Sequence, residues 1–415
     1  MLSPTSTGPL RDTSSGHPDH EYLRCSVPYG QKRADTPRFL VILDTGIGDA
    51  VVVGLSVIDQ IIRSDPRAAG TIDVLCNELQ AQIFAYDRRL NRIIQTSSVF
   101  YPGPRFSQAL RGITLDAQGA HVVQFLKQRR YEALFPSVFA PGLFFRLHAH
   151  LTYPSLTELA RAFIALRKLE DAPISQIARK MVNDYFASQD ALNQEIPLYL
   201  SARHIQRALS ILSRLKEYAA AAPQQCRLLL VAPDTASVVT RPPVSLLARA
   251  LSYALQSASN LVTGILPGYT DTMCAGNLFD MLSPCFPGRV FLLPGTPKPG
   301  LLEIAALIDL SDIFLSGDTG LMHLAVARKV LFEEDEQYTV PGYKTEIIAL
   351  FGGTNPGYFG HSERTIIIGK GRKEQRAFKP GISKESYNPK GRDLFDHITP
   401  QQVSDAIIAS ISRPV

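Results

Sequence analysis

Short, continuous runs of apolar residues recur along most of this chain, each followed by a turn and then by a helical pattern. Phe39–Leu43 and Ile313–Leu315 are two such runs, and their lack of alternation is typical of strands buried on both faces of a parallel sheet. Further strands are predicted at 71–76, 91–94, 131–135, 144–148, 227–232, 261–265, 290–293, 312–316, 347–351 and 365–368. Helices are predicted at 79–86, 201–222, 243–257, 301–308, 320–328 and 399–412. This alternation predicts an α/β fold with parallel sheets.

Length and local composition indicate how the chain is divided. At 415 residues it is long enough for two domains with separate cores. Residues 1–36 are rich in Ser, Thr, Pro, Gly and His, and we expect them to form a tail without a stable fold. We expect a first lobe over 37–210, a second over 211–398, and a closing helix within 399–415 that packs back on the first lobe.

Charge and cysteine usage narrow the function classes. A formal net charge of +5 gives no nucleic-acid signature, and it favours anionic substrates. The cysteines, which form no Cys-x-x-Cys pair, indicate a reducing compartment rather than a zinc site or a disulfide framework. The most apolar window, Phe39–Ile58, contains Asp44 and Asp49, so it is not a transmembrane span. We expect a cytoplasmic protein without integral membrane association, and peripheral attachment at the inner membrane stays open.

One turn in the second half carries most of the candidate chemistry. It reads Gly317-Asp318-Thr319-Gly320-Leu321-Met322-His323. Thr319 is suited to cap the following helix, so the amides of Gly320, Leu321 and Met322 would face outward at the positive end of the helix dipole. Such an end binds phosphate, and His323 lies within reach of the same anion. The alternative is an ordinary capped helix with one buried histidine.

A related turn follows the first strand. It reads Asp44-Thr45-Gly46-Ile47-Gly48-Asp49. Two glycines allow the backbone to turn sharply and approach a ligand closely. Asp49 lies at the start of the next helix, where it either only caps the helix or does chemistry. As a dinucleotide-binding fingerprint the match is poor, because Val51 replaces the third glycine and a carboxylate would face the pyrophosphate.

The two turns, in this order, resemble those of the glycosyltransferase family 9 heptosyltransferases, which transfer heptose from ADP-heptose. A third matching segment is Ala349–Pro356, which reads Ala-Leu-Phe-Gly-Gly-Thr-Asn-Pro. The resemblance covers roughly residues 38 to 90 and 226 to 410. It implies an α/β fold of the GT-B type, in which two Rossmann-like lobes with parallel sheets face a central cleft.

The resemblance also implies roles for the matching residues. Asp49 would be the general base of an inverting displacement at the anomeric carbon, with Thr45, Gly46 and Gly48 on the acceptor side. The implied donor-binding residues are Asp318, Thr319, Gly320, Leu321 and His323, with Asp271 at the ribose and Thr296 beside the adenine as looser matches. The family's phosphate-binding lysine is absent. Arg241 is the best substitute, since a guanidinium neutralises phosphate through two parallel hydrogen bonds, and Thr235 would add a hydroxyl contact.

We expect no metal and no cofactor beyond the nucleotide-sugar donor. No Asp-x-Asp string occurs at a strand end. The charge on the leaving nucleoside diphosphate would instead be stabilised by the amides after Gly320, by His323 and by Arg241.

Some features leave alternatives open. The Gly46-x-Gly48 pair and Glu78 also suit a nicotinamide-dependent oxidoreductase, and the missing lysine suits a binding protein of the same fold without turnover. An acidic insert lies between Lys329 and Lys344, and a basic stretch lies between Gly369 and Arg392. Each is an ordinary solvated segment or, for the basic one, a flap that attracts a phosphorylated substrate. A second basic group consists of Arg105, Arg111, Arg129 and Arg130. It favours an anionic acceptor, which could be a glycan, a lipid-linked saccharide or a small molecule.

Overall fold

The computed structural model describes thirteen segments of the chain: residues 37–43, 46–95, 124–129, 131–136, 173–189, 197–219, 226–235, 239–268, 272–293, 299–334, 345–361, 363–370 and 394–412. The expected tail, residues 1–36, and the expected strand at 144–148 lie outside them. The chain divides into two compact units, Met1–Leu169 with Ile174–Gln194 and Glu170–Pro173 with Glu195–Val415.

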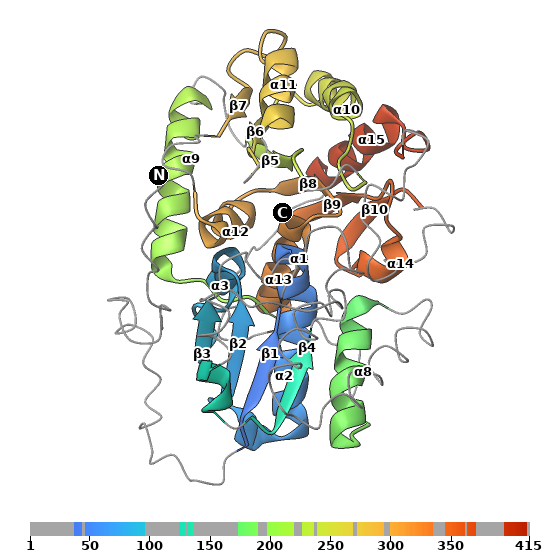
Figure 1. Cartoon of the computed structure of the whole chain (residues 1–415). Coiled ribbons are helices and arrows are strands. Elements are labelled where there is room, and N and C mark those ends of the chain that lie inside the picture. Colours follow the sequence, from blue (N-terminus) through green and yellow to red (C-terminus); the bar gives the residue numbers. More distant parts are fainter. Residues whose placement is uncertain are drawn as a thin grey trace, which may run out of the picture. The chain divides into compact units, whose positions relative to one another are not determined.

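The first unit contains a four-stranded parallel sheet with the order β3-β2-β1-β4 (Figure 1). Its strands are β1 (Phe39–Ile42), β2 (Ile72–Cys76), β3 (Leu90–Gln95) and β4 (Ala133–Pro136). Phe39 lies opposite Ile72 on one side and Ala133 on the other. β1 and β2 are buried at every position, as their continuous apolar runs predicted.

The helical segments described in the first unit include α1 (Ile47–Asp49), η3 (Ala50–Leu55), α2 (Ser56–Ser64), η4 (Pro66–Ala68), α3 (Glu78–Phe84) and α8 (Ile174–Phe186). The first three are continuous, and η3 is a π-helical segment between two α-helical ones. π-Helical insertions of this kind occur frequently at functional sites. The segment follows directly after Asp49.

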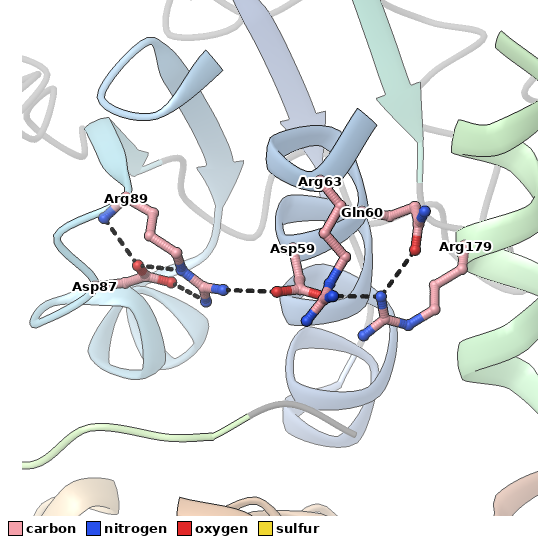
Figure 2. A network of polar contacts seen from close by, with 6 residues as sticks. All are labelled: Asp59, Gln60, Arg63, Asp87, Arg89 and Arg179. Atoms are coloured by element: carbon pink, nitrogen blue, oxygen red, sulfur yellow. Dashed lines mark hydrogen bonds and ion pairs between the residues drawn. The ribbon is translucent and has the colours of Figure 1, made fainter. Parts of the chain in front are cut away.

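An ion network joins α2 to α8 and to the loop before β3 (Figure 2). The Arg179 side chain of α8 is fully buried, and its Nη1 donates to Asp59 Oδ2 at 2.8 Å and to Gln60 Oε1 at 2.9 Å. Asp59 also contacts Arg63 at 2.7 Å and Arg89 at 3.5 Å. Burial raises the pKa of Asp59, but Arg179 and Arg63 more than offset this, so the pKa lies below its ordinary value.

The second unit contains a six-stranded parallel sheet with the order β10-β9-β8-β5-β6-β7 (Figure 1). Its strands are β5 (Arg227–Ala232), β6 (Leu261–Ile265), β7 (Val290–Leu292), β8 (Ile313–Gly317), β9 (Glu346–Leu350) and β10 (Thr365–Ile368). All six match strands predicted from the sequence. If β5 to β10 are numbered 1 to 6, the sheet reads 3-2-1-4-5-6 from the β7 edge, which is the doubly wound order of nucleotide-binding folds.

Helices cover both faces of this sheet. They are α9 (Ala202–Ala219), α10 (Val244–Ser257), α11 (Met273–Leu282), α12 (Leu301–Asp309), α13 (Gly320–Glu334), α14 (Pro356–Phe359) and α15 (Pro400–Ile411). Successive side chains of a strand point to opposite faces. Accordingly, Leu229 and Val231 share a core with α10, α11 and α15, whereas Leu230 and Ala232 share one with α9, α12 and α13.

Two helices of the second unit bear on the predicted division of the chain. The first lobe was expected to extend to residue 210, but Ala208 and Ile211 of α9 are buried with Leu307 of α12, so α9 belongs to the second unit. The closing helix was expected to pack back on the first lobe. Val403 and Ile407 of α15 are buried in the core that contains α10, because the apolar stripe of α15 completes one face of the second sheet. No helix among the described residues is long and apolar enough to cross a membrane.

Candidate functional site

The strand order of the second unit indicates a candidate ligand-binding edge at the carboxyl ends of β5 and β8. These strands are hydrogen-bonded neighbours, yet α10 follows β5 on one face of the sheet and α13 follows β8 on the other. The chain therefore departs in opposite directions from two adjacent strands. Doubly wound sheets bind their ligands at such a point.

Three turns are packed together at this edge. A Cβ atom added at Gly317, the last residue of β8, would overlap the carbonyl oxygen of Thr240 and come within 3.1 Å of Pro242 Cδ. A Cβ atom at Gly353, after β9, would overlap Val239. Only glycine permits these approaches. The loop after β5 is thus in contact with the turns after β8 and β9.

The turn after β8 ends in a capped helix, as predicted. Thr319 Oγ1 accepts a hydrogen bond from the Met322 amide at 3.3 Å, and the Thr319 carbonyl accepts one from the His323 amide at 3.3 Å. The expectation that the Met322 amide faces a ligand is wrong, because the cap engages it. Gly320 and Leu321 come before Met322 in the helix, and both residues are partly exposed. Their amides are therefore the ones suited to bind an anion.

His323 is more enclosed than the sequence suggested. Its side chain is 5% exposed, and its Nε2 lies 3.4 Å from Asp318 Oδ1, whose side chain is 8% exposed. On the other side, its Nδ1 lies 3.0 Å from Nε2 of His361, in the loop between α14 and β10. Sequence reasoning missed His361, because nothing in the local pattern relates it to a residue 38 positions earlier.

The loop after β5 brings the predicted Arg241 and Thr235 together. Arg241 Nη2 donates to the Thr235 carbonyl at 2.6 Å, and the hydroxyls of Thr235 and Thr240 are 2.9 Å apart. Asp234, to which no role was assigned, accepts bonds from the amides of Gly268, Cys274 and Ala275 at 3.1 to 3.3 Å. It therefore caps α11 and fastens the loop after β5 to the next crossover.

In the first unit, Asp49 is fixed at the end of α1. Its Oδ2 accepts a hydrogen bond from the Gly46 amide at 3.2 Å, so the capping function proposed as an alternative is present. The Gly46 carbonyl in turn accepts from Gln80 Nε2 at 3.2 Å. Gln80 is buried and was missed from the sequence, although Asn77 and Gln80 form a recognisable capping box at α3. This turn is thus held from both sides.

Other predicted residues fall into two groups. Thr45, Asp271 and Thr296, with Asp44, Arg105, Arg111, Arg130 and most of the acidic insert and the basic stretch, lie outside the described residues. Arg129 is described and is engaged elsewhere: its Nη1 is 3.0 Å from the buried Asp73, and its guanidinium lies 4.5 Å from the Phe125 ring centroid. These contacts tie Arg129 to its own unit. Glu78 is the first residue of α3.

Comparison with known proteins supports the resemblance. The family model of Glycosyltransferase family 9 (heptosyltransferase) matches residues 292–387. A glycosyltransferase family 9 structure from Veillonella parvula DSM 2008 has a TM-score of 0.63 at 14% identity over 91% of this chain and 98% of its own. E. coli ADP-heptose lps heptosyltransferase II has a TM-score of 0.58 at 16% identity, over 90% of this chain and 98% of its own. E. coli heptosyltransferase WaaC with ADP has a TM-score of 0.54 at 15% identity, over 90% of this chain and 99% of its own. No curated protein sequence matches the chain significantly.

One further similar structure concerns metals. The dodecameric glycosyltransferase TibC from enterotoxigenic E. coli is described as iron-containing, with a TM-score of 0.50 at 10% identity over 91% of this chain and 76% of its own. Among the described residues of the present chain, no group of three or more His, Cys, Asp or Glu side chains is placed to hold a metal ion. Residues 292–387 thus match glycosyltransferase family 9 (heptosyltransferase) in sequence, and the chain has the GT-B-like α/β fold, with two parallel sheets, of the heptosyltransferases.

Proposed function

We propose that this protein is an inverting heptosyltransferase that takes its sugar from a nucleoside diphosphate donor, ADP-heptose. The observation that carries the proposal is the capped amino terminus of α13 at the edge between β5 and β8. The comparisons support the choice of donor, because one similar structure is described as an ADP-heptose heptosyltransferase and another as a heptosyltransferase with ADP.

The donor diphosphate would bind at the turn after β8. The amides of Gly320 and Leu321, with the positive end of the α13 dipole behind them, suit a phosphate oxygen. Arg241 belongs to the loop that touches Gly317, so a guanidinium charge lies on a segment adjacent to this turn. Fixed donors of this kind can stabilise the charge that develops on the leaving diphosphate without reorganising.

Asp49 would act as the general base, accepting the proton of the acceptor hydroxyl as its oxygen attacks the anomeric carbon. Its bond to the Gly46 amide supports this role, because it fixes the carboxylate in one position. A carboxylate has several acceptor sites, so capping a helix and accepting a proton are compatible. The π-helical segment that follows Asp49 adds support, since such segments are frequent at functional sites.

Binding of ADP tests the donor site directly. Replacing Gly320 by Val places two methyl groups where the phosphate must approach, and we expect ADP affinity measured by calorimetry to fall at least tenfold, about 1.4 kcal/mol. Gly276→Val is the matched control, because a Cβ atom at Gly276 of α11 meets no other atom within 4 Å. NADH serves as the comparison ligand for an oxidoreductase.

Unchanged ADP affinity in a folded Gly320→Val protein would remove this turn from the donor site. Binding of NADH in preference to ADP would contradict the proposed reaction class altogether. Transfer of heptose from ADP-heptose to an acceptor, followed by release of ADP, is the positive result that the proposal requires.

A further inference from the structure

His323 is held between two side chains from different parts of the second unit. Asp318, one residue before the helix cap, lies 3.4 Å from Nε2, and His361 lies 3.0 Å from Nδ1. The two imidazole rings meet edge to face, with centroids 5.2 Å apart and planes at 73°. Both ring nitrogens of His323 therefore face a side chain of the protein itself.

The chemistry of the three groups sets which ring nitrogens carry protons. An ionised carboxylate can only accept, so the nitrogen of His323 that faces Asp318 carries the proton. In a neutral imidazole the other nitrogen is then an acceptor. When His323 is neutral, its Nδ1 accepts from His361, whose Nε2 then carries the proton. The chain of donors thus runs from His361 through His323 to Asp318.

His361 is well anchored for this task. Its carbonyl oxygen accepts hydrogen bonds from the amides of Arg364 and Thr365 at 3.0 and 2.9 Å, and from the Thr365 hydroxyl at 2.7 Å. Thr365 is the first residue of β10, which pairs with β9 next to β8. The sheet itself therefore fixes the distance between the backbone of His361 and the turn after β8.

We propose that His361 is a positioning residue of the donor site, which selects the Nε2–H tautomer of His323 and through it holds the Asp318 carboxylate in the turn. This inference rests on the proposed function, because the turn matters only if it binds the donor. His361 does not touch the donor in this scheme. It acts by keeping Asp318 directed toward the histidine, away from the anion that Gly320 and Leu321 receive.

The arrangement has an electrostatic purpose at a phosphate site. A carboxylate one residue before the anion-binding amides would repel a diphosphate if it turned toward it. Next to His323 Nε2, the carboxylate has its charge partly compensated by an N–H dipole. Removing His361 frees the ring of His323 to adopt the other tautomer or to rotate, and Asp318 then loses the donor that restrains it.

Two variants separate positioning from bulk. In His361→Gln the side-chain amide can still donate from about the position of Nε2, whereas His361→Leu fills similar space without a donor. We expect ADP affinity to fall about tenfold in the leucine variant, as for loss of one partner of a buried hydrogen bond, and to be largely restored in the glutamine variant. Calorimetry with ADP alone measures this, and Gly276→Val is again the control.

The tautomer can be read without any ligand. Long-range proton–nitrogen spectra of protein labelled with nitrogen-15 histidine distinguish a protonated from an unprotonated ring nitrogen, and a His323→Gln sample assigns the signals among the nine histidines. We expect unprotonated Nδ1 in the wild type and in His361→Gln, and a changed pattern in His361→Leu. The wild type and the glutamine variant keep the test decisive if the leucine variant does not fold.

Wild-type His323 with a protonated Nδ1 and an unprotonated Nε2 would overturn the inference. So would a folded His361→Leu protein with unchanged ADP affinity. Failure of the donor site is a separate result, because it appears as unchanged ADP affinity in Gly320→Val whatever the tautomer of His323.

Discussion

Replacement of Asp49 separates its two roles, because capping needs only an acceptor oxygen whereas general-base catalysis needs a carboxylate. Asp49→Asn keeps an oxygen that can accept from the Gly46 amide, now 3.2 Å from Oδ2, but it cannot take up a proton at neutral pH. Asp49→Ala removes both functions. If Asp49 is the base, the two variants should be almost equally inactive and unequally stable.

The structure sets the size of each effect. The Asn variant loses only the interaction of a negative charge with the amino terminus of the helix that runs from Ile47 through Ser64, about 0.3–1 kcal/mol. The Ala variant also loses a partly exposed hydrogen bond, about 0.5–1.5 kcal/mol more. Loss of a general base lowers turnover on the order of a hundredfold or more, about 2.7 kcal/mol in the barrier. The catalytic loss in the Asn variant thus exceeds its stability loss.

Urea unfolding gives the stabilities, and initial rates of ADP release in the presence of acceptor give the turnover. ADP affinity should be unchanged in both variants. Gln402→Ala is a suitable control, because Gln402 Oε1 accepts from the Thr399 amide at 2.8 Å and caps α15 as Asp49 caps α1. It should lose comparable stability and keep its activity. Turnover within a few-fold of wild type in Asp49→Asn would show that Asp49 is only a cap.

Two further predictions concern the first unit and the leaving group. Asp59→Asn removes the charged partner of the fully buried Arg179 and should cost about 3 kcal/mol of stability at neutral pH. Asp65→Asn changes a pair with the 73% exposed Arg67 and should cost well under 1 kcal/mol. Folding lowers the pKa of Asp59. The contribution of Asp59 to the free energy of unfolding is therefore complete above its unfolded-state pKa and is lost as the pH falls through the lower folded-state pKa. In urea titrations, the free energies of unfolding of the wild type and Asp59→Asn should become equal in strong acid. Sugar transfer should proceed at close to its normal rate in excess EDTA, and loss of activity that magnesium or iron restores would refute the assigned stabilisers of the diphosphate.

The strands were predictable because each is a short apolar run closed by a turn. Ile313–Leu315 is buried on both faces, as its run of apolar residues without polar alternation predicts. α8 was not predicted, because its inner face carries Arg179 and Asn183, polar residues that are buried only through partners more than a hundred positions earlier. The π-helical segment after Asp49 could not be predicted either, since side-chain spacing does not report a change in backbone hydrogen bonding.

The parts of the candidate site formed by local backbone structure were predictable, whereas the side-chain contacts between distant loops were not. The cap at Thr319 follows from a hydroxyl residue before a helix, which is a local signal. The roles of His361, Gln80 and Asp234 depend on neighbouring strands bringing distant loops together, which no local pattern specifies. The sequence therefore indicates what a turn offers to a ligand better than it indicates what holds that turn in place.

The contacts of α8 have a consequence for biosynthesis. Arg179 and Asn183 complete bonds to Asp59 and Gln60, which precede them by 120 and 123 positions. At typical elongation rates of about 5–20 residues per second, α2 leaves the ribosome on the order of ten seconds before α8. During that interval Asp59 and Gln60 lack the hydrogen bonds that α8 provides. We therefore expect the first unit to reach its native packing only after α8 has been synthesised, and α2 to need protection by a chaperone until then.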